Sequence, residues 1–202
     1  MNKSLSEYHS LIDLFDEFRE HIKPVVINGL PDFTTSAMEN QYNDLKLLQE
    51  RLGNIQISDW DVSKQVDYHV LRSEMNGVEF DHRVLKQWSR DPGFYNLTDG
   101  IYPRLLVHHS RSLSDWGLYE PEFPLPTKDY EDFKTKLKVI PKLFDQAKHN
   151  LTNAVPELAE IAIRVKEKDI QLLDGFKNEF LNHHQELVPI LEQAIIATKD
   201  FR

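Results

Sequence analysis

The chain contains no cysteine in its 202 residues. Disulfide bonds, a catalytic thiolate and cysteine-ligated zinc are therefore all excluded. A cysteine-free chain suits a reducing or an oxidising compartment equally well, so this absence does not indicate where the protein works.

Basic residues are also scarce. Lysine and arginine number 24 against 33 aspartates and glutamates, which gives a net charge of −9. Because phosphate binding requires clustered positive charge, we predict no nucleic-acid partner and no binding to an anionic membrane surface. No apolar run approaches the roughly 18 residues that span a bilayer, so we also predict no membrane span.

Glycine occurs only seven times, never in the spacing of a phosphate-binding loop or of a nucleophile elbow. The first residues, from Met1 to Glu7, lack the apolar region of a signal peptide. The sequence leaves the location open: cytoplasmic as it is written, or periplasmic or secreted if a signal sequence was removed.

Hydrophobic residues spaced three and four apart run through most of the chain, which is the pattern of amphipathic helices. Ser36 stands three residues before Glu39, the spacing of a helix-capping box. Pro141 and Pro189 are expected to kink or restart their helices. The sequence therefore predicts an all-α fold, a single helical domain over residues 1–202 built as a bundle of long, partly kinked helices. The predicted helices cover about residues 4–22, 36–54, 62–87, 127–152 and 156–200.

One long segment, residues 88–126, breaks this helical pattern. It is rich in proline and glycine, and aromatic residues are interleaved with these breakers. Loops of this length in compact domains are usually functional or wrapped over a surface. We predict an ordered loop anchored by its aromatic side chains, which are Phe94, Tyr95, Tyr102, Trp116, Tyr119 and Phe123.

The predicted helix 62–87 carries the main candidate site residues. Asp67, Glu74 and Asp81 are each seven apart, so they fall on nearly one line of a helix, with His82 close by. The same face carries apolar residues, and a carboxylate among them must be paired or hydrogen-bonded. One interpretation is a buried polar ladder satisfied by basic or hydroxyl partners. The other is a cleft lined by carboxylates with perturbed pKa values.

No metal site is predicted in this chain. Glu79 and His82 have the Glu-x-x-His spacing of helical di-iron proteins, but Glu179 and His183 are four apart, so the required second copy fails. The sequence His-Glu-x-x-His does not occur. The charged run Arg164–Asp169 mixes both signs, which favours a solvated helix face.

One long and specific sequence pattern runs from Gln65 to Gly77 and is continued by Phe80–Leu85 and by Trp88–Tyr95. Shorter stretches accompany it in Leu14–Glu20, in Gly29–Thr34 and between Ile140 and Thr152. Together these stretches resemble the N-terminal region of the bacterial domain-of-unknown-function family 885. The resemblance covers nearly the whole chain.

The resemblance implies an all-helical fold similar to metallopeptidases whose zinc-binding His-Glu-x-x-His helix lies in a C-terminal half. No residue here matches that helix, so no catalytic residue is assigned and zinc is expected only in the absent C-terminal half. Two functions remain open. The chain is the non-catalytic N-terminal helical portion of a bacterial metal-dependent hydrolase, or it is a stand-alone helical binding or scaffold protein without enzymatic activity.

A missing half would leave apolar surface in need of a cover. The expected partner is that C-terminal catalytic half or, in its absence, a second copy in a homodimer. The surface is expected on residues of the last helices and of the aromatic loop, namely Leu187, Leu191, Ile195, Ile196, Tyr102, Trp116 and Tyr119.

Overall fold

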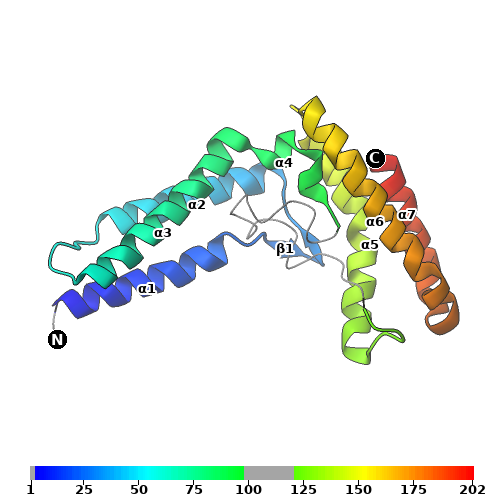
Figure 1. Ribbon diagram of the computed structural model, residues 1–202, viewed down its shortest axis with the longest axis horizontal. Coiled ribbons are helices and arrows are strands. Elements are labelled where there is room, and N and C mark those ends of the chain that lie inside the picture. The colour runs from blue at the N-terminus through cyan, green and yellow to red at the C-terminus, as the bar shows by residue number, and fades with distance from the viewer. Residues whose placement is uncertain (1–2, 98–120) are drawn as a thin grey trace. The chain divides into compact units, whose positions relative to one another are not determined.

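The computed structural model describes residues 3–97 and 121–202, and in them the predicted all-α fold is confirmed (Figure 1). The residues divide into two compact units rather than the single domain that the sequence predicted. Unit 1 comprises residues 1–24 and 34–85, and unit 2 comprises residues 25–33 and 86–202. None of the described helices is long and apolar enough to cross a membrane.

Unit 1 is a three-helix arrangement of α1 (Lys3–His21), α2 (Thr35–Gly53) and α3 (Val62–Phe80). Each helix lies within one or two residues of its predicted range at the start. The caps explain these starts, since Thr34 accepts a hydrogen bond from the Ala37 N–H and Asp61 accepts one from the Lys64 N–H. The cap of α2 is thus Thr34 and not Ser36.

The core of unit 1 lies where the apolar stripes of its three helices meet. Half of its side chains are leucine, and Trp60 joins them from the loop between α2 and α3. The Tyr8 ring packs edge-on against Trp60 with 5.5 Å between centroids, which attaches α1 to that loop. The core comprises Leu11, Leu14, Phe18, Ile22, Leu45, Leu48, Leu52, Trp60, Tyr68, Leu71, Met75 and Val78.

The third predicted helix changes its winding before its end. After Phe80 the backbone forms a π-helix, η1 (Asp81–Leu85). Lys86 then adopts a left-handed conformation with φ 47°, which stops the helix. The predicted continuous helix to residue 87 is therefore wrong over its last turns.

Unit 2 is built on α5 (Thr127–Asn150), α6 (Pro156–His183) and α7 (Val188–Phe201), with α7 packed against both of the others. Helix α5 continues through Pro141. The predicted helix 156–200 is interrupted by a short 3-10 turn, η5 (Gln185–Leu187), before Pro189 enters the first turn of α7. Proline is favoured there because its missing N–H has no helical partner anyway.

Two short helices lie in the segment that was predicted as an aromatic loop. They are α4 (Gln87–Arg90) and η2 (Pro92–Tyr95), and Asp91 caps the second by accepting a hydrogen bond from the Gly93 N–H at 2.8 Å. Tyr95 is buried as an anchor, as predicted. Tyr102, Trp116 and Tyr119 lie outside the described residues.

A small hairpin was not predicted from the sequence. Strands β1 (Val26–Ile27) and β2 (Leu30–Pro31) pair antiparallel, with Val26 opposite Pro31 and Ile27 opposite Leu30. Asn28 and Gly29 form its turn with φ values of 52° and 82°. Asn-Gly is the preferred pair for a turn that needs two left-handed residues, so the signal was present in the sequence.

The apolar surface expected on the last helix is mostly absent. Leu187, Leu191 and Ile195 are buried in unit 2, and only Ile196 is exposed. Helix α7 packs against α5 and α6, and η5 packs against α6 and α7, so these three buried residues belong to the packed interior of the unit.

Candidate functional site

The structure separates the four residues that were predicted as a ladder. Asp67 is exposed, and its carboxylate accepts a hydrogen bond from the Tyr8 hydroxyl at 2.7 Å. Glu74 and Asp81 are half-buried, and His82 is buried. The predicted burial of Asp67 is therefore wrong.

Helix geometry explains the error. The buried face of α3 is centred on Tyr68, Leu71, Met75 and Val78. Asp67 lies roughly 60° to one side of that centre at 100° per residue, next to Val70, which is also exposed. Beyond Phe80 the wider π-helical turn changes the register, so a wheel drawn for α3 does not place Asp81 and His82.

In the described residues, the glutamate of the Glu-x-x-His motif, Glu79, forms ion pairs. The Glu79 carboxylate lies 2.8 Å from Arg83 and 3.2 Å from Lys46, and hydrogen bonding to Arg83 holds the pKa of Glu79 below its usual range. The His82 ring lies 5.8 Å from the ring of Tyr42. Within residues 3–97 and 121–202, no three His, Asp or Glu side chains come together as a metal-binding group.

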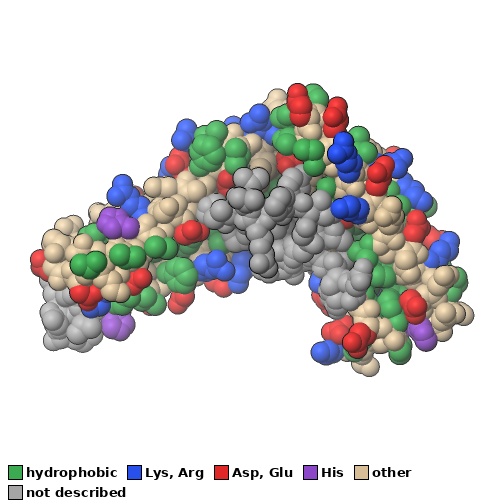
Figure 2. Space-filling model, in the orientation of Figure 1, with side chains coloured by type: hydrophobic (Ala, Val, Ile, Leu, Met, Phe, Trp, Pro, Cys, Tyr) green, Lys and Arg blue, Asp and Glu red, His purple; other side chains and the backbone are tan. Residues whose placement is uncertain are grey.

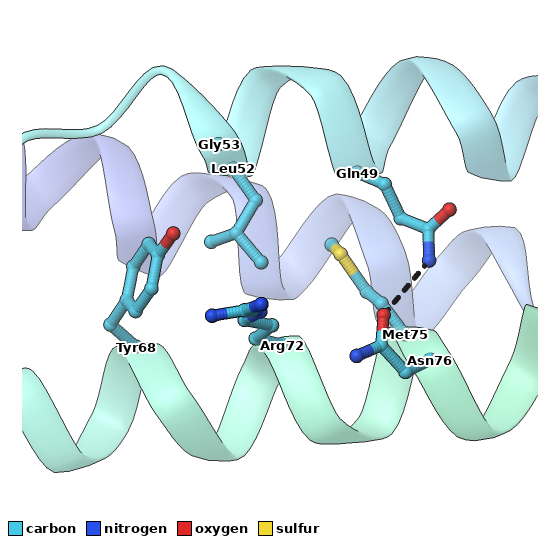
Figure 3. A pocket seen from close by; sticks show the side chains of 7 residues that line it. All are labelled: Gln49, Leu52, Gly53, Tyr68, Arg72, Met75 and Asn76. Carbon is cyan, nitrogen blue, oxygen red and sulfur yellow. Dashed lines mark hydrogen bonds between the residues drawn. The ribbon is translucent and has the colours of Figure 1, made fainter.

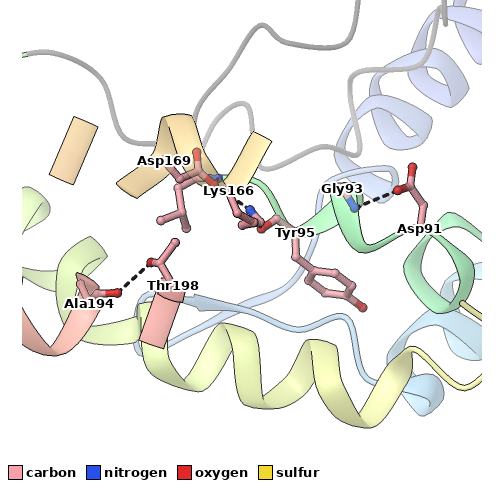
Figure 4. A network of polar contacts seen from close by, with 8 residues as sticks. Asp91, Gly93, Tyr95, Lys166, Asp169, Ala194 and Thr198 are labelled. Carbon is pink, nitrogen blue, oxygen red and sulfur yellow. Dashed lines mark hydrogen bonds and ion pairs between the residues drawn. The ribbon is translucent and has the colours of Figure 1, made fainter. Parts of the chain in front are cut away.

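The most strongly buried polar centre lies in unit 2, on α6. Lys166 and Asp169 are 1% and 0% exposed, one turn apart, and their side chains meet at 2.7 Å (Figure 4). The Lys166 ammonium also donates to the Tyr95 carbonyl at 2.7 Å. Asp169 in turn accepts a hydrogen bond from the Leu97 N–H at 3.3 Å.

This pair is held in an almost dry environment. The Lys166 ammonium lies 5.2 Å from the ring centroid of Phe144 and 5.9 Å from that of Phe201, within the range of cation–π attraction. Burial lowers the pKa of Lys166, and the neighbouring Asp169 carboxylate acts in the opposite direction. A buried charge is tolerated when it is paired and hydrogen-bonded, and both conditions are met here.

A second set of hydrogen bonds continues from the same centre. The Tyr95 hydroxyl donates to the Trp88 carbonyl at 2.6 Å and accepts from the Asn150 amide at 2.9 Å. Asn150 also donates to the Phe33 carbonyl at 2.6 Å, which attaches the residues after the hairpin to α5. Burial raises the pKa of Tyr95, so its hydroxyl stays protonated as this donor.

A hollow of about 160 Å³ adjoins the pair, between the start of α6 and the end of α7. Lys166 and Arg202 contribute the only charged groups among the described residues that line it. The remaining lining is formed by Pro92, Leu151, Ala159, Ala162, Ile163 and Phe201. The Lys166 ammonium is engaged by Asp169 and by the Tyr95 carbonyl. The centre is therefore suited to holding the backbone of residues 95–97 against α6 rather than to nucleophilic attack.

The charged run Arg164–Asp169 was therefore predicted only half correctly. Arg164, Glu167 and Lys168 are exposed, whereas Lys166 and Asp169 are buried. The signal was present, because Lys166 follows Ala162 by four residues and Asp169 precedes Leu173 by four, which places both on the apolar stripe of α6.

Comparison with known proteins gives a likeness in fold alone. No family model matches the chain, and no curated protein sequence matches it. Among solved structures, a proposed lipoprotein of unknown function from Shewanella oneidensis is similar, with a TM-score of 0.63 and 15% identity. The similarity covers 100% of this chain and 36% of that chain, so this chain spans about a third of its neighbour's length.

Proposed function

We propose that these residues are the non-catalytic helical portion of a larger bacterial protein of the metal-dependent hydrolase type. In this proposal the zinc centre and the catalytic residues lie outside the chain. The helices described here supply a scaffold against which a catalytic half packs.

The proposal rests on the share of each chain that the structural similarity covers. The whole chain is similar in fold to 36% of a longer protein. The sequence run Gln65–Tyr95, with its resemblance to the N-terminal region of family 885, supports the same placement. The Lys166–Asp169 pair fits a scaffold role, since its hydrogen bonds hold the backbone of Tyr95 and Leu97.

A second candidate is a stand-alone helical binding or scaffold protein, and the surface of unit 1 favours it. Val62, Val66 and Val70 are each four residues apart on α3 and all exposed, so they line one face of that helix. Figure 2 shows hydrophobic side chains at the surface along α3 and α1. On α1, Ile12 and Phe15 are exposed as well. In this second candidate function, a partner other than a catalytic half binds to these exposed apolar side chains.

The test is to compare the 202-residue chain with the product of the complete reading frame that encodes it. The proposal predicts a His-Glu-x-x-His motif downstream, and zinc-dependent peptide hydrolysis in the complete product alone. A reading frame that ends at Arg202, or one that continues without this motif, would contradict the hydrolase proposal and favour the stand-alone protein.

A further inference from the structure

A hollow of about 340 Å³ in unit 1 lies between α2 and α3 (Figure 3). Tyr68, Arg72 and Asn76 follow one another along α3 on one side, and Gln49, Leu52 and Gly53 lie opposite on α2. The volume is at the lower end of small-molecule sites, which run from about 300 to 1,000 Å³. The hollow is distinct from the Lys166 centre, because all of its residues belong to unit 1.

The polar groups of the hollow are mainly hydrogen-bond donors. Arg72 carries five N–H groups in a planar fork, Tyr68 contributes a hydroxyl, and the amides of Gln49 and Asn76 meet at 3.2 Å with one Asn76 N–H₂ group beside them. Leu52 and Met75 form the apolar wall. An apolar wall with converging donors is the arrangement that holds a ligand by an acidic group.

Arg72 is the one charged side chain among the described residues that line the hollow. In unit 1 the described side chains of Lys23, Lys46, Lys64, Arg51 and Arg83 each lie within ion-pairing distance of an acidic side chain. Arg72 has no ion-pair or hydrogen-bond partner among the residues that the structure describes, and neither has the Tyr68 hydroxyl. Arg19 is likewise without such a partner, but it does not line the hollow.

We infer that this hollow binds a carboxylate, with the Arg72 fork and the Tyr68 hydroxyl as the groups that hold it. Arginine binds a carboxylate through two parallel N–H bonds, and the geometry is specific for two oxygens in one plane. The carboxylate belongs to a small acid or to a glutamate side chain of a bound peptide. The inference is independent of the hydrolase proposal, since it uses no residue outside this chain.

The experiment uses the methyl signal of Met75 in the wall of the hollow. The 202-residue chain is labelled at the methionine methyl groups and titrated at pH 7 with succinate, with N-acetyl-glutamate amide, and with the uncharged analogues succinamide and N-acetyl-glutamine amide. Met38 lies on the same unit but does not line the hollow, so its signal is the internal reference.

We expect a saturable shift of the Met75 signal with at least one of the two acids and none with the uncharged analogues. Arg72→Gln should weaken the binding at least about tenfold, whereas Arg19→Gln removes an equally unpaired arginine and should leave it unchanged. Succinate acting alone assigns the site to free acids, and a response to the blocked glutamate extends it to acidic peptides.

A variant that adds bulk beside the hollow without removing a polar group gives an independent check. Gly53 lines the hollow, and a Cβ there would meet nothing within 4 Å, so Gly53→Leu adds an apolar side chain at the edge of the hollow. It should weaken the Met75 shift while the helical circular dichroism stays unchanged. The inference is overturned if neither acid shifts Met75, or if the shift persists in Arg72→Gln.

Discussion

The residues that most constrain unit 2 are Lys166 and Asp169, because removing a charge from water has a large free-energy cost. That cost is offset only when the partner charge and the remaining hydrogen bonds are all present. Here the carbonyl of Tyr95, the N–H of Leu97 and two aromatic rings complete the set. Either side chain left alone would be an uncompensated charge in a dry core.

We predict that Lys166→Met and Asp169→Leu each lower the free energy of unfolding by roughly 3–5 kcal/mol. The double variant should lose clearly less than the sum of the two, because it leaves no unpaired charge. Urea unfolding of the three variants measures this coupling. Lys168→Met, which removes an exposed lysine from the same run, is the control and should change stability by under about 0.5 kcal/mol.

An additive result, with each single change costing under about 1 kcal/mol, would contradict the buried pair.

Gly29 is constrained both by its backbone and by its neighbours. Its φ of 82° lies in the left-handed region, and a Cβ built there would come 2.3 Å from Cγ2 of Thr135 on α5. We predict that Gly29→Ala lowers the free energy of unfolding by roughly 1–3 kcal/mol. Thr135→Ala should restore part of the loss, because it removes the atom that clashes.

Gly53→Ala is the matched control in thermal melts, since its Cβ would enter open space at the end of a helix. If Gly29→Ala melted no lower than Gly53→Ala, the close packing of the hairpin on α5 would be refuted.

At the scale of elements, the sequence predicts those helices best whose boundaries have a local cause. Helices α1, α2 and α3 begin where predicted, because their apolar spacing and their caps are encoded within a few residues. The restart of the last helix at Val188 also has a local signal, because Pro189 lies in its first turn. The π-helical turn Asp81–Leu85 has no such local signal, and periodicity within a single helix does not report it.

The end of α3 is held to α2 by a carboxylate, which gives unit 1 a pH dependence. Glu79 pairs with Arg83 and with Lys46, and these partners lower its pKa. A carboxyl whose pKa is lowered by folding stabilises the fold at pH values above its pKa in the unfolded chain, which is about 4.3. This contribution is lost as the pH falls through the lower pKa of the folded chain.

We predict that Glu79→Gln lowers the free energy of unfolding at pH 7 by under about 1 kcal/mol, since the pair is near the surface. The difference from the unsubstituted chain should be smaller at pH 3 than at pH 7. Chemical unfolding at the two pH values measures it, with Glu39→Gln as the control. A difference that stayed the same at both pH values would show that the effect is not electrostatic.

At the scale of the whole molecule, the sequence predicted the all-α class but not the division into two units. Apolar spacing identifies which face of a helix is buried. It does not identify which helices share a core, so the division into two compact units was not predicted. The buried pair was missed for a related reason, because a run of mixed charge on α6 was considered without its position on the stripe.

The candidate site was likewise predicted from spacing along one helix, without its packing against other helices. Asp67 was assigned to the core from a line of carboxylates, although that line follows the edge of the apolar face. His82, which was expected only to lie near this line, is buried and lies on the π-helical turn. The hollow of unit 1 was not predicted, because it is formed by two helices whose relative register the sequence does not specify.

We propose that the zinc chemistry implied by the family resemblance lies outside these 202 residues, and this proposal is the central one to test. The most direct measurement is the zinc content of the purified chain by elemental analysis, after loading with zinc and dialysis against a weak chelator. The account predicts far less than one zinc per chain. One tightly held zinc per chain would contradict it and would place a metal centre within this sequence.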